Sequence, residues 1–270
     1  MKIYLIVLIS VVVFVQAQST DSKEKRRNAM KVCSKKTNLN LKKNEQYLKA
    51  VAEGGNQIQA FAECILREQD FISTTGEILF EEIKKAPPSG IYPEKYSAFV
   101  NQCKSEKGNN ITETSYKFEK CLTEIIAKTR QEQREKKTRA MKICSDKTKV
   151  NITEYENYKK ALSEGTPEVK AYSECYLREL GYTDGNGNIL YEEIKKSPPS
   201  RISYEKYSTF VDQCKNEKGS NASETSYKFS SCLMKTYEEY KATKHQKRKA
   251  QKKHKYCNSF KLIYYYVIIF

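Results

Sequence analysis

The sequence contains little of what enzymes most often use for catalysis. Among its 270 residues there are only 2 histidines and no tryptophan. Both histidines, His245 and His254, lie in a basic C-terminal segment. The body of the chain therefore has no residue for a Ser-His-Asp triad, a Cys-His pair or an imidazole metal site. We expect a protein that is not an enzyme and that needs no cofactor.

A calcium site is also missing. The run Asp184-Gly185-Asn186-Gly187-Asn188 begins like a calcium-binding loop. However, Ile189 and Lys195 occupy the positions where such a loop needs Gly and Glu. We interpret the run as a turn between helices and expect no metal.

Acidic residues are fewer than basic ones, and the last 31 residues contain none. The chain has 49 Lys and Arg against 33 Asp and Glu, a net charge of +16, and no acidic residue follows Glu239. Such a basic block is usually a solvated tail, but it also suits polyanions such as heparin or polyphosphate. We do not expect nucleic acid as a partner, because the N-terminal residues described next indicate a secreted protein. The candidate polyanion-binding residues are Lys244, Lys247, Arg248, Lys249, Lys252, Lys253 and Lys255.

Long hydrophobic runs are limited to the N-terminus, where Ile3–Val15 is apolar and Ala17 precedes a polar region. This layout is typical of a secretory signal peptide over residues 1–17. The alternative is a membrane anchor, but the run is shorter than the roughly 20 residues that a spanning helix needs. We therefore expect a secreted, extracellular protein without a membrane span.

The most specific feature is an internal repeat. Cys33, Cys64, Cys103 and Cys121 recur 111 residues later as Cys144, Cys175, Cys214 and Cys232. We infer a tandem duplication, with a first domain at 18–128, a second at 129–240 and a basic tail at 241–270.

Each copy has the pattern of an all-α domain with about six short helices. Tyr96, Phe99, Val100 and Cys103 recur at intervals of three and four, which is one face of a helix. The few glycines and prolines lie between such segments. None occurs between Gly108 and Gly165. The last helix of the first copy is therefore expected to run into the second, as one rigid helix or with a kink.

Four cysteines per copy in a secreted chain indicate two disulfides, for which three pairings exist. Helical packing favours Cys33 with Cys64 and Cys103 with Cys121, with the same pairs in the second copy. Each bridge is expected to stabilise its domain by about 3 to 4 kcal/mol. Cys257 has no partner in either copy. Glycosylation sequons occur at Asn110, Asn151 and Asn221.

Several motifs together resemble the insect odorant-binding proteins. They are the run from Cys175 to Tyr182 that leads to residues 184–190, its counterpart after Cys64, and the stretches ending at Cys121-Leu122 and Cys232-Leu233. That family usually has six cysteines. Here the positions of the second and the fifth hold Ala60 and Thr112 in the first copy, and Ala171 and Ser223 in the second. The chain is similar to the subgroup that lacks one bridge.

Two such domains in one chain also resemble the long-form salivary odorant-binding-like proteins of blood-feeding flies. The resemblance implies helical capsules that bind a small apolar or amphipathic ligand, such as an amine, an eicosanoid or an odorant, and a salivary role against host mediators. The alternative function is a polyanion-binding protein that interferes with clotting or defence. The candidate ligand-binding residues are Phe99, Tyr116, Phe118, Phe210, Tyr227 and Phe229, although such side chains more often simply fill a core.

Overall fold

The structure is a computed structural model that describes residues 24–39, 41, 44–152 and 154–267. The expected signal peptide therefore lies outside the described residues. The described chain divides into two compact units. The first comprises the residues up to Lys136 together with Lys195–Tyr207, and the second comprises Lys137–Ile194 together with the residues from Ser208 onward.

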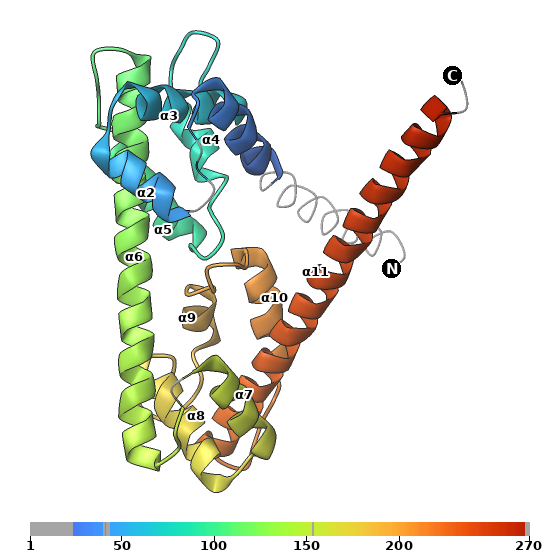
Figure 1. Ribbon diagram of the computed structural model, residues 1–270. Coiled ribbons are helices and arrows are strands. Elements are labelled where there is room, and N and C mark those ends of the chain that lie inside the picture. Colours follow the sequence, from blue (N-terminus) through green and yellow to red (C-terminus); the bar gives the residue numbers. More distant parts are fainter. Residues whose placement is uncertain (1–23, 40, 42–43, 153, 268–270) are drawn as a thin grey trace, which may run out of the picture. The chain divides into compact units, whose positions relative to one another are not determined.

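The described residues form helices and two isolated β-bridges, which confirms the all-α prediction. A helix over residues 24–36 comes first. The labelled helices follow in chain order (Figure 1): α2 Asn44–Glu53, α3 Asn56–Glu68, α4 Phe80–Lys84, α5 Pro93–Cys103, α6 Ile111–Thr148, α7 Tyr155–Glu164, α8 Pro167–Glu179, α9 Tyr191–Lys195, α10 Tyr204–Cys214 and α11 Ala222–Val267.

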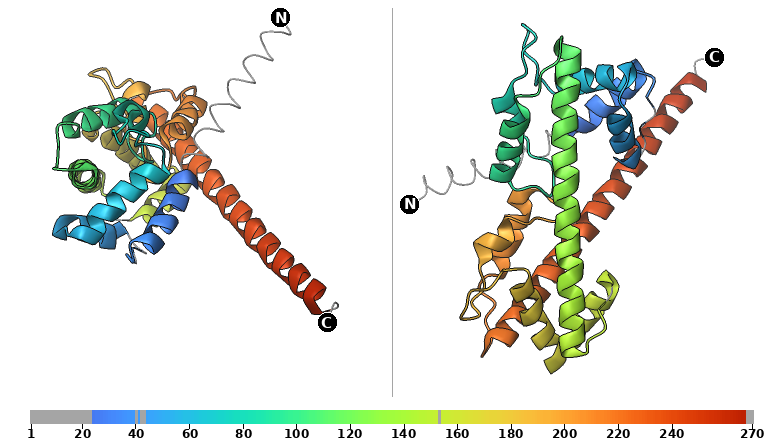
Figure 2. Two further views of the ribbon diagram at one scale, coloured as in Figure 1. Left: turned by 90° about the horizontal axis from the view of Figure 1, so that it is seen from above. Right: turned by 90° about the vertical axis from the view of Figure 1, so that its left-hand side faces the viewer.

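The last helix of each copy is long. For α6 this confirms the expected continuation into the second copy, whereas α11 is longer than the short helices expected within each copy. Helix α6 has 38 residues and α11 has 46. The right-hand view of Figure 2 shows α6 along its length as one uninterrupted helix. With no glycine or proline inside it, nothing in the sequence of α6 breaks its hydrogen bonding.

Both long helices begin with the same capping arrangement. Asn110 Oδ1 accepts a hydrogen bond from the Glu113 N–H at 2.9 Å, and the Glu113 carboxylate accepts one from the Asn109 N–H at 2.7 Å. In α11, Asn221 and Glu224 take the same roles. These contacts satisfy backbone N–H groups that a helix start leaves unpaired.

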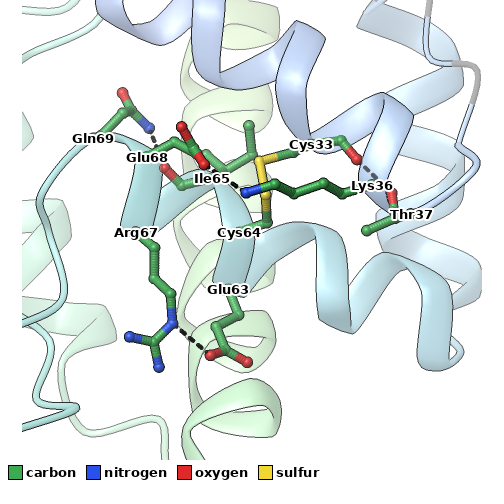
Figure 3. Close-up of a disulfide and its surroundings, with 9 residues drawn as sticks. All are labelled: Cys33, Lys36, Thr37, Glu63, Cys64, Ile65, Arg67, Glu68 and Gln69. Carbon is green, nitrogen blue, oxygen red and sulfur yellow. Dashed lines mark hydrogen bonds and ion pairs between the residues drawn. A yellow bond between two sulfur atoms is a disulfide. The ribbon is translucent and has the colours of Figure 1, made fainter.

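Four disulfides join the helices in the pairing that helical packing favours: Cys33–Cys64, Cys103–Cys121, Cys144–Cys175 and Cys214–Cys232. Figure 3 shows the first bridge, which ties the helix over residues 24–36 to α3. Beside it Lys36 Nζ lies 2.8 Å from Glu68 Oε1. The second unit repeats this pair as Lys147 and Glu179 at 3.2 Å.

Lys195–Tyr207 belongs to the first unit through a close backbone contact. The Gly90 N–H donates to the Ile202 carbonyl at 3.0 Å, and the rings of Tyr92 and Tyr204 meet edge to face at 5.1 Å. A Cβ on Gly90, whose φ is +85°, would lie 2.5 Å from the Cα of Ser200. Only glycine permits this approach and this backbone angle.

Candidate functional site

The interior of each unit is the candidate site, since it holds the aromatic residues singled out from the sequence. In the first unit Phe118 is fully buried and its ring meets Phe80 edge-on at 5.3 Å. Phe99 on α5 is also buried, and Lys95 Nζ lies 5.8 Å from its ring centre. Both phenylalanines pack in the core between α5 and α6.

The second unit repeats the first of these contacts and adds a different one at Phe210. Phe229 is buried and meets Tyr191 edge-on at 5.4 Å. Phe210 is also buried, and its ring meets that of Tyr240 edge-on at 5.5 Å. All four phenylalanines therefore contribute to packing, and their contact with a ligand stays a prediction.

Tyr116 and Tyr227 use their hydroxyl groups to hold helices together. Tyr116 Oη donates to the Val51 carbonyl at 2.8 Å, and Tyr227 Oη donates to the Leu162 carbonyl at 3.0 Å. Gly165, with φ +63°, ends α7 and leaves room for Tyr227, whose Oη would lie 2.6 Å from an added Cβ. The two tyrosines thus anchor α6 to the end of α2 and α11 to the end of α7.

A polar group that the sequence did not single out lies inside the first unit. Tyr47 on α2 donates from its hydroxyl to Glu119 Oε2 on α6 at 3.2 Å, and the Tyr47 ring packs 6.1 Å from that of Phe61. Burial raises the pKa of Glu119, against the opposing effects of Arg26 and the Tyr47 hydrogen bond. Burial also raises the pKa of Tyr47 well above its ordinary value, and the negative charge of Glu119 adds to this shift.

At the matching place in the second unit, hydroxyl groups take the place of the carboxyl group. Ser230 replaces Glu119, and Tyr158 hydrogen-bonds with Ser230 and Ser173. The rings of Tyr172 and Tyr176 stack beside Tyr158 at 5.9 Å from each other. The two interiors therefore both have aromatic walls, but a carboxyl group lies beside Tyr47 where a serine hydroxyl lies beside Tyr158.

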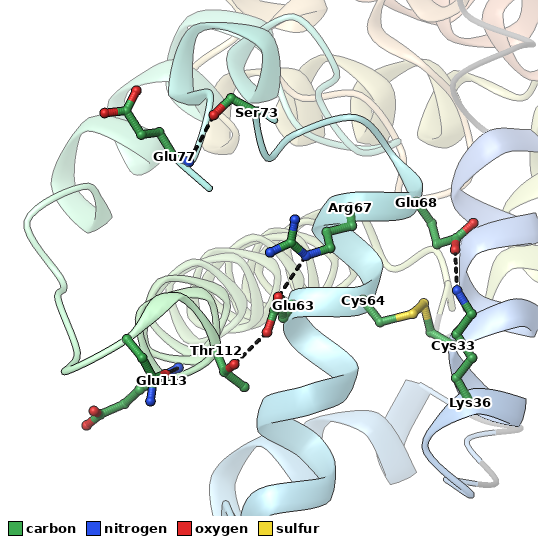
Figure 4. Close-up of polar contacts among 11 residues, drawn as sticks. Cys33, Lys36, Glu63, Cys64, Arg67, Glu68, Ser73, Glu77, Thr112 and Glu113 are labelled. Atoms are coloured by element: carbon green, nitrogen blue, oxygen red, sulfur yellow. Dashed lines mark hydrogen bonds and ion pairs between the residues drawn. A yellow bond between two sulfur atoms is a disulfide. The ribbon is translucent and has the colours of Figure 1, made fainter. Parts of the chain in front are cut away.

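In each unit, a hydrogen bond links the two helices near the place of the missing third disulfide. In the first unit Thr112 Oγ1 donates to Glu63 Oε2 at 2.5 Å, and Arg67 Nε donates to Glu63 Oε1 at 2.7 Å (Figure 4). Ser223 and Glu174 repeat the first contact at 2.6 Å. Thus α3 is tied to the start of α6, and α8 to the start of α11, without a covalent bond.

Two of the three sequons lie at helix starts on the surface. Asn110 and Asn221 are exposed, and each uses Oδ1 to cap its helix. Asn151 is exposed as well, but Thr153 of its sequon lies outside the described residues. These positions are compatible with glycosylation, which stays a prediction.

Among the described side chains, Lys244 is the one member of the predicted polyanion set that can be placed. Its Nζ lies 5.3 Å from the centre of the Tyr240 ring and 3.4 Å from the Tyr240 hydroxyl. The other six side chains lie outside the described part, although the backbone there is helical. In the portion of the chain that is described, no acidic, Cys or His cluster suits a metal and no helix is long and apolar enough to cross a bilayer.

Comparison with known families gives one result, found twice. A sequence model of the PBP/GOBP family matches residues 15–124 and again residues 126–236. None of the curated proteins matches the chain, and none of the solved structures does. The two matches follow the tandem duplication and together span most of the chain.

Proposed function

Because the chain belongs to the PBP/GOBP family of insect odorant-binding proteins, we propose that it is a secreted carrier that takes hydrophobic or amphipathic ligands into the interiors of its two units. Membership in this family implies non-enzymatic binding of small hydrophobic molecules. The four disulfides agree with secretion, since such bridges persist in oxidising compartments.

The observation that carries the proposal is the double family match, supported by the same two-bridge framework in both units. Each interior joins aromatic rings with a few hydroxyl groups, which is the composition expected of a site for small, mostly apolar molecules. Tyr47 and Tyr116 line the first unit as only partly buried residues, and Tyr176 and Tyr227 do so in the second.

A salivary role against host amines or eicosanoids is the finer form of the proposal. It rests on the tandem arrangement, which is similar to that of the long-form salivary proteins of blood-feeding flies. Protein mass spectrometry of salivary glands and of antennae tests it. The salivary form requires the chain in the glands, whereas presence in antennae alone would make it an odorant carrier.

Displacement of a fluorescent apolar probe tests the carrier function itself. The chain has no tryptophan, so the probe must supply the signal. We expect N-phenyl-1-naphthylamine to bind the full chain saturably and to be displaced by micromolar 1-dodecanol. Absence of saturable probe binding to the oxidised protein would remove the carrier proposal.

A second function, binding of polyanions, is favoured by one observation. Helix α11 runs as far as Val267 and therefore carries the tail lysines and Arg248 on a helical backbone instead of a loose chain. Polyanions such as heparin or polyphosphate suit such a concentration of positive charge. Interference with clotting or immune defence would follow from that binding.

A further inference from the structure

Two of the sequons occupy equivalent positions at the starts of the long helices. Asn110 directly precedes α6 and Asn221 directly precedes α11, and both residues are exposed. Asparagine glycosylation joins the side-chain amide nitrogen to a sugar and requires a Ser or Thr two residues later. Thr112 and Ser223 supply that hydroxyl group. The repeat therefore offers the same acceptor group in both units.

The helix cap uses the other atom of the same amide. Asn110 Oδ1 accepts a hydrogen bond from the Glu113 N–H, and Asn221 Oδ1 accepts one from the Glu224 N–H, each at 2.9 Å. A glycan is attached at Nδ2, so the amide oxygen keeps the lone pairs that accept these hydrogen bonds. Modification at Nδ2 is therefore compatible with the folded helix start.

The hydroxyl group of each sequon is already engaged in the folded protein. In the first unit Thr112 Oγ1 donates to Glu63 Oε2 (Figure 4), and the Thr114 N–H donates to the Asn110 carbonyl at 3.0 Å. The second unit repeats the two contacts at 2.6 and 3.0 Å. A transferase must bind the amide and the hydroxyl together, which requires local opening of such a helical turn. The folded sequons are therefore poor acceptors.

From these contacts we propose that Asn110 and Asn221 carry N-linked glycans, which are added before the first turns of α6 and α11 form. The donor is a lipid-linked oligosaccharide pyrophosphate. Nδ2 forms a bond to the anomeric carbon of the sugar and gives up one proton, while the bond from that carbon to the pyrophosphate oxygen breaks. The lipid pyrophosphate leaves with the electron pair of the broken bond. The proposal shares secretion with the proposed function and does not depend on ligand binding.

Peptide mapping by mass spectrometry of the full chain secreted by insect cells tests the sites. With Asn151→Gln as the background, which removes the third sequon, we expect glycopeptides at Asn110 and at Asn221. Asn110→Asp and Asn221→Asp should each lose one glycan, since aspartate still caps a helix but has no acceptor nitrogen. Asn109 is an exposed neighbour outside the sequon, so Asn109→Asp is the matched control and should keep both glycans.

Glycan transfer in vitro tests the order of events. Bacterially produced protein, which carries no glycans, is incubated with solubilised oligosaccharyltransferase and its lipid-linked donor. The oxidised, folded chain should accept glycans at least about tenfold more slowly than the reduced, unfolded chain, because helical turns hold its sequons. Equal rates for the two forms would show that folding does not close the sequons, and the proposed order would be wrong.

The outcomes separate this proposal from the carrier function. A chain recovered from the medium without sugar at Asn110 and Asn221 would overturn the site assignment, while secretion and ligand binding would stand. A glycan that persists in Asn110→Asp would belong to another residue and would contradict the assignment as well. Mapping of the parent chain locates the glycans directly, so the test remains valid even if a variant is not secreted.

Discussion

Glu224 holds the start of α11 through its carboxylate. The backbone N–H and the hydroxyl of Ser220 both donate to Glu224 Oε2, at 2.8 and 2.7 Å. These two hydrogen bonds, with the positive charge of Lys228, lower the pKa of Glu224 from 4.5 to about 2. A carboxyl group whose pKa is lower in the folded state stabilises the fold above its unfolded pKa, and this stabilisation is lost as the pH falls.

The resulting prediction concerns the pH range between about 4.5 and 2. In Glu224→Gln, thermal unfolding should depend less on pH over this range than in the unaltered protein, because the group that takes up the proton is gone. Melting followed by circular dichroism at several pH values measures this. Glu217→Gln, which alters an exposed glutamate in the preceding turn, is the control. Equal pH dependence in Glu224→Gln and the unaltered protein would contradict the assigned role.

Thr112 is a second residue with a specific structural role, since it links α6 to Glu63 on α3. Thr112→Val should lower the free energy of unfolding by about 1 kcal/mol, because it removes a hydrogen bond to a charged group and leaves the shape nearly unchanged. Denaturant titration of bacterially produced protein measures the change without interference from glycans.

Thr112→Ser is the natural control for that experiment. Ser223 makes the same contact with Glu174 in the second unit at 2.6 Å, so a serine at position 112 should preserve most of the stability. If Thr112→Ser lowered the free energy of unfolding as much as Thr112→Val, packing of the threonine methyl group, and not the hydrogen bond of its hydroxyl, would stabilise the contact between α6 and α3.

At the scale of the elements, α6 makes the clearest prediction. The exposed residues Arg134, Lys136 and Arg139 offer trypsin sites within this helix, but a protease needs extended backbone and a continuous helix resists it. We expect slow cleavage in limited proteolysis. Glu135→Pro should make the segment sensitive, because an interior proline costs a helix about 3 kcal/mol.

Glu135→Ala is the control, since alanine favours a helix and should preserve resistance. Mass spectrometry of the fragments locates the cuts. Rapid cleavage of the unaltered chain after Arg134 or Lys136 would show that α6 is interrupted in solution.

The elements were largely predictable because their signals are local. The spacing of the cysteines and the three-and-four pattern around Phe99 and Val100 depend on near neighbours in the chain. The pairing of Cys33 with Cys64 followed from the packing of adjacent helices. The absence of Gly and Pro between Gly108 and Gly165 likewise predicted the continuation of α6.

The interior polar contacts were not predictable in the same way. Tyr47 and Glu119 are 72 residues apart, and Glu63 and Thr112 are 49 apart. No local pattern marks such pairs. Glu119 also lies between Phe118 and Lys120 in a charged helix, where a glutamate ordinarily faces water. Only the fold shows that it points inward.

For the whole molecule, the basic tail and the helical units should act independently. Polyanion binding releases counterions, so its affinity falls steeply with salt, whereas burial of an apolar ligand hardly responds. Replacing the seven basic residues from Lys244 to Lys255 with Gln should weaken heparin binding at least about tenfold, or 1.4 kcal/mol, without changing probe binding. Heparin titrations at several salt concentrations measure the loss of affinity and its salt dependence, and a titration with the fluorescent probe measures ligand binding.

The outcome that contradicts this prediction is heparin affinity that stays unchanged in the neutralised chain. Polyanion binding would then belong to the helical units, whose surfaces also carry many lysines. The tail would have no part in it.

The count of ligands bound per chain tests the central claim most directly. Native mass spectrometry of the oxidised, full-length protein with 1-dodecanol should show complexes with one and with two ligands and no more, because each disulfide-bridged unit encloses one interior. Binding should disappear when the bridges are reduced and the protein unfolds. Oxidised protein that carries no ligand, or that accumulates ligands without limit as a nonspecific surface does, would contradict the account of two ligand-binding units.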